Sequence, residues 1–128
     1  MVIVVLQGSV LGPVLFILFI NDVTDCISHS ATVKLFADDL KLHSEISCPL
    51  QFIIIQHNLN NIFNWSVMWQ LSISSPKCST LHLGTLPANK YHINDFSICN
   101  TSPVKDLGIM FDSNLKFIHH IQDIVSSK

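Results

Sequence analysis

The change in hydrophobic period near Leu71 constrains the fold of this chain more than any other sequence feature. Before it, from Phe52 to Trp69, apolar residues recur at helical spacing with Gln, His and Asn between them. After Leu71 apolar and polar residues alternate, and clusters of turn-forming residues interrupt the alternation. The sequence therefore predicts an α+β fold, in which a long helix precedes several short antiparallel strands at 78–83, 90–93, 96–98 and 105–111.

Local patterns predict two elements before that long helix. Pro13 suits the first turn of a helix, and the apolar run 14–20 predicts a helix that lies against the sheet and is buried on most sides. Residues 33–42 predict two strands with a tight turn at Asp38 and Asp39, because apolar and polar residues alternate on both sides of that turn. We expect the turn to be exposed and the side chains of Leu35 and Leu42 to be buried.

Proline and asparagine mark the starts of the remaining two helices. Pro49 begins the long helix, and Asn114 is expected to cap a last one. The apolar side chains expected on the inner face of the last helix are Leu115, Ile118, Ile121 and Val125.

Composition limits the size and class of the protein. A length of 128 residues suits one domain. Charged residues make up 12%, about half the usual share of roughly 25%, as expected for a piece of a larger domain that has lost some surface. The formal charge is −2, and every basic residue apart from histidine is a lysine. This composition argues against a basic nucleic-acid-binding surface, and without arginine a bidentate guanidinium clamp on phosphate is impossible.

Neither cysteines nor the N-terminus point to secretion. The four cysteines, Cys26, Cys48, Cys78 and Cys99, are widely spaced, and we interpret them as reduced core thiols. The longest uninterrupted apolar run near the N-terminus, residues 14–20, is far shorter than the ~20 residues needed to span a bilayer. No basic region precedes it, as a signal peptide would require. A buried helix is the preferred interpretation, and a small secreted or membrane-associated protein is a further alternative.

The strongest chemical feature is the tetrapeptide Phe36-Ala37-Asp38-Asp39. Two adjacent carboxylates in a tight turn offer the hard oxygen ligands that Mg²⁺ prefers. Aspartate also favours turns for purely structural reasons, so the tetrapeptide alone is weak evidence. Its context adds weight, because other short motifs flank it in a fixed order: Gln7-Gly8-Ser9-Val10-Leu11-Gly12-Pro13, Ile20-Asn21-Asp22, Trp65, Trp69-x-Leu71, Lys77-Cys78, His82-Leu83-Gly84, Lys105-Asp106-Leu107-Gly108 and His120-Ile121.

In this order the motifs resemble the reverse transcriptase of non-LTR, LINE-like retrotransposons, from Gln7 to about His120. The resemblance implies part of a polymerase palm, an antiparallel sheet backed by helices, over residues 1–128. Residues 7–83 would form the palm core, 84–112 the strands that support the primer, and 113–128 the start of a thumb helix.

The resemblance also implies roles for individual residues. Asp38 would be a ligand of catalytic Mg²⁺, with Asp39 beside it in a supporting role. Gln7, Gly8 and Ser9 would form the loop that meets the template and the incoming nucleotide. Lys77 matches the position that protonates the leaving pyrophosphate, and Leu81 to Gly84 would begin the hairpin that supports the primer end.

The implied activity is RNA-directed DNA polymerisation by two-metal phosphoryl transfer of a deoxynucleotide to a primer 3′-hydroxyl. The implied partners are an RNA template, a DNA primer and deoxynucleotides, without a membrane or a clear protein partner, at an intracellular location in nucleus or cytoplasm.

Several features of the sequence depart from the family pattern. The first metal aspartate of the family lies upstream of the Gln-Gly loop, and none of the residues before Gln7 is acidic. The fingers are also missing. Other departures are the segment Val4-Val5-Leu6 and the residues Leu40 and Ser74. We therefore expect a fragment that is inactive alone, and the main alternative is a non-catalytic remnant or interaction module.

Three other residue patterns carry less weight. Cys78 and His82 would lie about 13 Å apart on a strand, too far for one zinc ion, and Cys26 with His29 lacks a second pair. Trp65 and Trp69 could stack on nucleobases, but their place in the apolar stripe favours packing on the sheet. His119 and His120 could form an acid–base pair, although a partly buried structural His120 is the preferred interpretation.

Overall fold

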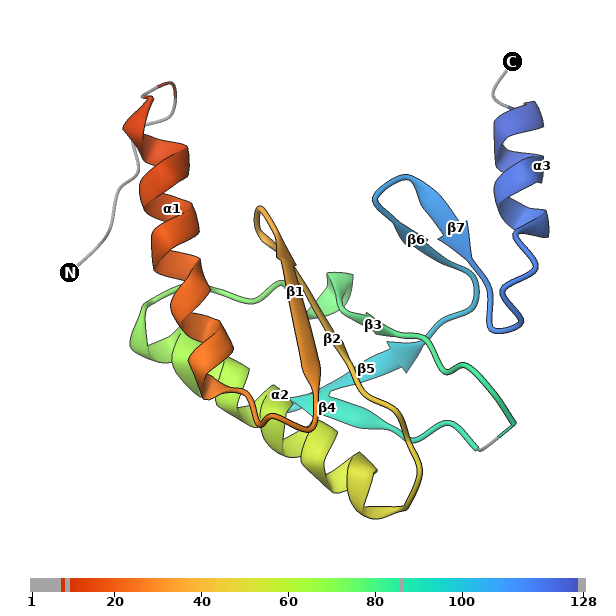
Figure 1. Ribbon diagram of the computed structural model, residues 1–128, viewed down its shortest axis with the longest axis horizontal. Helices are drawn as coiled ribbons and strands as arrows, with labels where there is room; N and C mark the ends of the chain where they lie inside the picture. The colour runs from red at the N-terminus through yellow and green to blue at the C-terminus, as the bar shows by residue number, and fades with distance from the viewer. Residues whose placement is uncertain (1–7, 9, 86, 127–128) are drawn as a thin grey trace. The chain divides into compact units, whose positions relative to one another are not determined.

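The chain divides after Ile73 into two compact units, which are described separately below (Figure 1). The computed structural model describes residues 8, 10–85 and 87–126. The elements in these residues confirm the α+β class.

The first unit is built around a long helix and a hairpin. The hairpin strands pair antiparallel, with Thr32 opposite His43 at the open end and Phe36 opposite Asp39 at the turn. The 19-residue helix begins after Pro49, as predicted. The elements of the unit are α1 (Leu11–Asn21), the 3₁₀ helix η1 (Asp22–Cys26), β1 (Thr32–Phe36), β2 (Asp39–His43) and α2 (Leu50–Met68).

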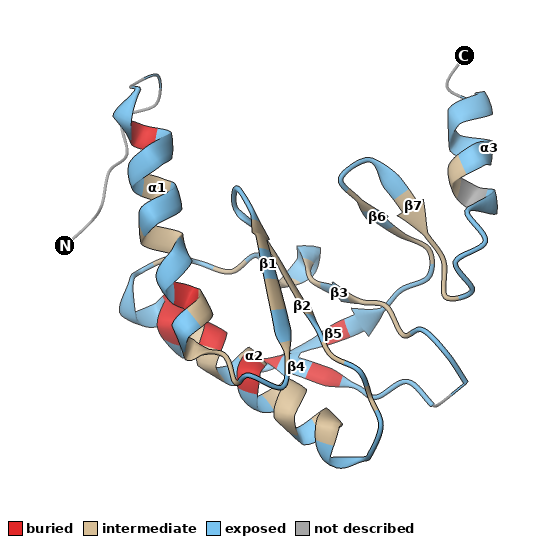
Figure 2. Ribbon diagram, in the orientation of Figure 1, coloured by how far each residue is buried: buried red, intermediate tan, exposed pale blue. Residues whose placement is uncertain are grey.

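The core of the first unit lies where η1, α2 and the hairpin meet. Val23, Ile62 and Trp65 are buried there (Figure 2). The helical stripe predicted for α2 supplies two of these three side chains, so that prediction is confirmed. Partly buried side chains surround them, and Leu35 and Leu42 belong to this shell rather than to the buried centre where they were expected: Phe19, Ile20, Cys26, Ile27, Leu35, Leu40, Leu42, Leu71 and Ile73.

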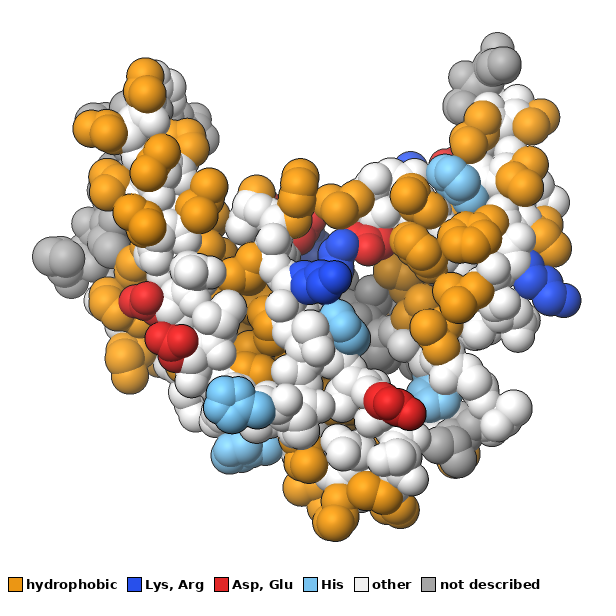
Figure 3. All heavy atoms as spheres, in the orientation of Figure 1, with side chains coloured by type: hydrophobic (Ala, Val, Ile, Leu, Met, Phe, Trp, Pro, Cys, Tyr) orange, Lys and Arg blue, Asp and Glu red, His pale blue; other side chains and the backbone are white. Residues whose placement is uncertain are grey.

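Helix α1 forms as predicted but is not buried on most sides. Phe19, near its C-terminal end, contacts the rings of Trp65 and Trp69 at centroid distances of 5.9 and 4.8 Å. The ring contacts of α1 are therefore with Trp65 of α2 and with Trp69 just after it, and α1 also contacts η1. Most other apolar side chains of α1 remain open to solvent, with Leu18 65% exposed, and Figure 3 shows them along the helix. Within the described residues no helix has the length and apolarity to cross a bilayer.

The second unit consists of short strands and one helix. A small sheet has the order β3-β5-β4, and β6 and β7 form a separate hairpin. The core of this unit is formed by Tyr91 and Ile93, which are buried on either side of an exposed residue in β4, and by Ile98 of β5. The elements are η2 (Ser75–Lys77), β3 (Ser79–Thr80), β4 (Tyr91–Ile93), β5 (Phe96–Asn100), β6 (Val104–Asp106), β7 (Ile109–Phe111) and α3 (Ile118–Ser126).

Three predictions for the second unit are wrong. Strand β3 pairs with β5 in parallel, not antiparallel, and is only two residues long. The strand expected at 105–111 is a hairpin instead, because Leu107 and Gly108 turn the chain with positive φ values of 46° and 85°. Helix α3 starts four residues after Asn114, since two residues between them, Leu115 and Phe117, have left-handed backbone. The apolar side chains expected inside that helix are exposed: Leu115, Ile118, Ile121 and Val125.

All four cysteines are free thiols, but none is buried. Cys26 and Cys78 are half-buried, whereas Cys48 and Cys99 are exposed. The expectation that they fill the core is therefore wrong. Burial of one side raises the pKa of the Cys78 thiol, which favours its neutral form.

Candidate functional site

The paired aspartates lie at the turn of the β1–β2 hairpin. Ala37 and Asp38 form the turn, and Asp39 is the first residue of β2. Ala37 has φ 52°, a left-handed conformation that residues other than glycine seldom adopt, and it allows the tight reversal. Both carboxylate side chains are exposed. The turn thus presents two acidic groups to solvent from one fixed segment of backbone.

Alternation along the hairpin separates an inner face from an outer one. Leu35 and Leu40 face each other across the strands and pack against the core. On each strand the residues that alternate with these inner positions form the outer face, because successive side chains of a strand point to opposite sides. These outer residues are Thr32, Lys34, Phe36, Asp39, Lys41 and His43.

A buried asparagine on α2, Asn58, holds the start of the hairpin. Asn58 is fully buried, and its Oδ1 accepts a hydrogen bond from the backbone N–H of Ser28 at 3.0 Å while its Nδ2 donates to Ser28 Oγ at 3.0 Å. Asn61, one turn further along α2, donates to the carbonyl of Cys26 at 2.9 Å. At the same open end of the hairpin, Ser44 Oγ, just after β2, donates to the carbonyl of Ser30 at 3.1 Å. Helical periodicity identifies the apolar positions of α2 but does not show which polar side chain between them is buried.

We expect Asn58→Leu to lower the free energy of unfolding by about 1–3 kcal/mol, because it leaves the Ser28 N–H without its acceptor. Chemical denaturation followed by circular dichroism measures the loss. The matched control is Asn64→Leu, an exposed asparagine of the same helix, which should change stability by less than about 0.5 kcal/mol. Equal stability of the two variants would show that the Asn58 contacts do not hold the hairpin.

The ligands at the turn fit Mg²⁺ but form an incomplete set. Carboxylate oxygens suit this ion, which usually combines one or two protein carboxylates with substrate phosphates and water. Among the described residues no group of three or more His, Cys, Asp or Glu side chains could hold a metal. The hairpin therefore offers Asp38 and Asp39 as a partial site.

The other predicted site residues belong to other segments of the chain. Gly8 is exposed with φ 89°, a conformation that favours glycine. Gln7 and Ser9, its predicted partners in the nucleotide loop, lie outside the described residues. Lys77 is exposed at the end of η2 in the second unit. Of the predicted site residues, the structure therefore brings together Asp38 and Asp39, at the hairpin turn.

Of the tryptophans and histidines that were given less weight in the sequence, Trp65 and His120 have contacts that suit a structural role. Trp65 is buried in the first core, and Trp69 is 37% exposed. His120 is half-buried, and its Nδ1 accepts a long 3.5 Å hydrogen bond from the Met110 N–H, in keeping with a structural role. Nothing is described of the His119 side chain.

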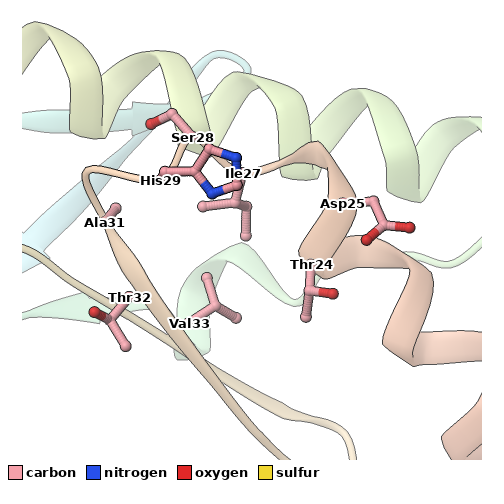
Figure 4. Close-up of a pocket in the computed structure, with 8 residues that line it drawn as sticks. All are labelled: Thr24, Asp25, Ile27, Ser28, His29, Ala31, Thr32 and Val33. Carbon is pink, nitrogen blue, oxygen red and sulfur yellow. The ribbon is translucent and has the colours of Figure 1, made fainter.

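An open hollow lies beside the start of the hairpin (Figure 4). Asp25 and His29 are its ionisable residues, and both are exposed. Asp38 and Asp39 are not among the residues around it, which are Thr24, Asp25, Ile27, Ser28, His29, Ala31, Thr32 and Val33. The hollow is therefore separate from the aspartate turn.

Comparison with known proteins gives concordant matches. A family model described as reverse transcriptase (RNA-dependent DNA polymerase) matches residues 2–111. The chain is 30% identical to the RNA-directed DNA polymerase from mobile element jockey of Drosophila funebris, over 94% of this chain and 14% of that protein. It is also 30% identical to the probable RNA-directed DNA polymerase from transposon X-element of Drosophila melanogaster, over 92% of this chain and 14% of that protein. No solved structure matches the chain.

Proposed function

Because the chain belongs to the reverse transcriptase (RNA-dependent DNA polymerase) family, we propose that it contributes the aspartate hairpin to an RNA-directed DNA polymerase. The chain spans about one seventh of the curated relatives it matches, 14% of their length. The activity of a whole polymerase is therefore part of the proposal.

The observation that carries the proposal is the position of Asp38 and Asp39. Both are exposed at the turn of a hairpin whose other side is packed against the core. Hydrogen bonds between Asn58 and Ser28 and from Ser44 to Ser30 hold the open end of this hairpin. Together with the packing of Leu35 and Leu40 on the core they support a hairpin that keeps the carboxylates in position, as groups that act on a transferring phosphate must be held.

In the proposed reaction a primer 3′-hydroxyl attacks the α-phosphate of a deoxynucleotide, and pyrophosphate leaves. Asp38 would bind catalytic Mg²⁺ with Asp39 in support, and the bound ions would reduce the negative charge that builds up on the phosphoryl oxygens. The Nζ of Lys77 would donate a proton to the pyrophosphate. The backbone at Gly8, with Gln7 and Ser9, would approach the template and the nucleotide.

The test is an RNA-templated primer-extension assay on this chain combined with the upstream polymerase segment of a related intact element. We expect Asp38→Asn to lower extension by roughly 10³-fold, because several kcal/mol of transition-state stabilisation are lost with the metal ligand. The matched control is Asp95→Asn, since Asp95 is likewise an exposed aspartate between two paired strands, β4 and β5. It should leave extension unchanged.

Two results would contradict the proposal. Extension that is equal in Asp38→Asn and the unchanged chain would show that another polymerase is responsible. A soluble, associated complex without extension would favour the alternative of a non-catalytic remnant, and Leu6, Leu40 and Ser74 would be the first positions to restore to the family residues.

A further inference from the structure

The outer face of the β1–β2 hairpin gathers the lysines of the first unit. The register pairs Lys34 directly with Lys41, so both side chains leave the hairpin on the side opposite Leu35 and Leu40. Lys34 is exposed and Lys41 is half-buried. The sequence from residue 8 to residue 73 contains no other lysine and no arginine. The permanent positive charge of this unit is therefore placed on one face, next to the aspartate turn.

The outer face carries two lysines against the single carboxylate of Asp39, and this pairing of lysines favours a further anion there. Residues directly opposite each other in an antiparallel pair have Cβ atoms about 4.5–5.5 Å apart, and like charges at that spacing destabilise the hairpin. An anion that contacts both ammonium groups converts this repulsion into attraction. Each ammonium carries three N–H donors, so a lysine that already makes one contact keeps donors for a phosphate oxygen.

The shape of the face favours an extended ligand. Three pairs run in a row from the open end of the hairpin to the turn: Thr32 with His43, Lys34 with Lys41, and Phe36 with Asp39. A five-residue strand is about 16 Å long. Phe36 is 61% exposed, and an exposed aromatic ring beside lysines is typical of surfaces that bind single-stranded nucleic acid. A row of this kind fits a stretch of sugar–phosphate backbone better than it fits one compact triphosphate.

We propose that Lys34 and Lys41 bind phosphate groups of a nucleic acid strand that passes along the outer face of the hairpin. The inference rests on the proposed function, because the strand would lead to the aspartate turn. It does not need the broad basic surface that the composition argues against, since two lysines give modest and sequence-independent binding.

The experiment measures binding of the 128-residue chain to a fluorescein-labelled single-stranded oligonucleotide by anisotropy, over a series of KCl concentrations. For each lysine replaced, in Lys34→Gln, Lys41→Gln and the double variant, we expect the slope of log K against log [KCl] to fall by about 0.7. A fall of about 0.7 in the slope means that each lysine variant binds the oligonucleotide about five-fold more weakly than the unchanged chain at about 0.1 M KCl. Lys34→Arg, which keeps the charge, should retain the slope, and so should the control Lys116→Gln, an exposed lysine of the second unit.

A second arm separates the possible sources of phosphate, with a fluorescent deoxynucleoside triphosphate as probe. Lysine-dependent binding of the triphosphate but not of the oligonucleotide would overturn the assignment of a strand. The inference is also overturned if the folded chain binds no oligonucleotide, or if the double variant keeps the affinity and slope of the unchanged chain. If the oligonucleotide binds through the lysines but no Asp38-dependent primer extension is found, the proposed function is refuted and the binding inference is not.

Discussion

The 128-residue chain assayed alone, with a primed RNA template, deoxynucleotides and Mg²⁺, is expected to leave the primer unextended. Its acidic pair comes from a single turn, and no third His, Cys, Asp or Glu side chain joins it among the described residues. Because Mg²⁺ holds its water strongly and needs further ligands, the two exposed carboxylates should bind it weakly. Its relatives are about seven times as long, since the chain spans 14% of each.

Addition of the upstream polymerase segment should raise extension from background by several orders of magnitude, because the complex would then hold primer, nucleotide and metal together. The product is measured as labelled primer lengthened on a denaturing gel. Omission of Mg²⁺ and addition of the segment alone are the controls. Extension by the isolated chain that is lost in Asp38→Ala would refute the prediction of an inactive fragment and would place a complete active site within these residues.

Trp65→Ala is expected to destabilise the first unit strongly without unfolding it completely. Trp65 is 8% exposed and is one of three buried apolar residues in that core among those described. Truncation of a large buried aromatic side chain costs about 3–5 kcal/mol, and the total stability of a small domain is about 5–15 kcal/mol. The loss is measured as a shift in the midpoint of urea denaturation, followed by circular dichroism.

Two further tryptophan variants test this explanation. Trp69→Ala should cost far less, because Trp69 is 37% exposed although it contacts the same Phe19 ring. Trp65→Phe should keep most of the stability, since the indole N–H of Trp65 has no hydrogen-bond partner in the described part of the chain. Equal losses in Trp65→Ala and Trp69→Ala would show that this core does not hold the first unit together.

Helices and turns of the first unit could be predicted because their causes are local. The helical spacing of the apolar residues places Ile62 and Trp65 on the inner side of α2, and Pro49 marks its start. The aspartate turn follows from alternation on both sides of residues whose side chains favour turns. The family, likewise, could be inferred from short motifs in a fixed order, and the comparisons confirm it.

Elements of the second unit were predicted less well because their pattern is ambiguous. The run 105–111 alternates like one strand, but positive φ values at Leu107 and Gly108 make it a hairpin. The apolar residues of α1 predicted burial, yet most of these side chains are exposed, and the ring contacts with Trp65 and Trp69 come from Phe19 near its C-terminal end. Hydrophobic side chains are buried only where another element covers them, and local sequence does not contain that information.

The sequence by itself determined the fold class, the family and the identity of the acidic pair, because these depend on residue type, spacing and order. Only the tertiary structure decided that Asn58, alone among the asparagines of α2, is fully buried and anchors Ser28. Strand register likewise decided that Lys34 faces Lys41. The physical reason is that hydrogen bonds and strand pairs join residues far apart in the chain, and a shift of one residue in register would move every side chain to the opposite face.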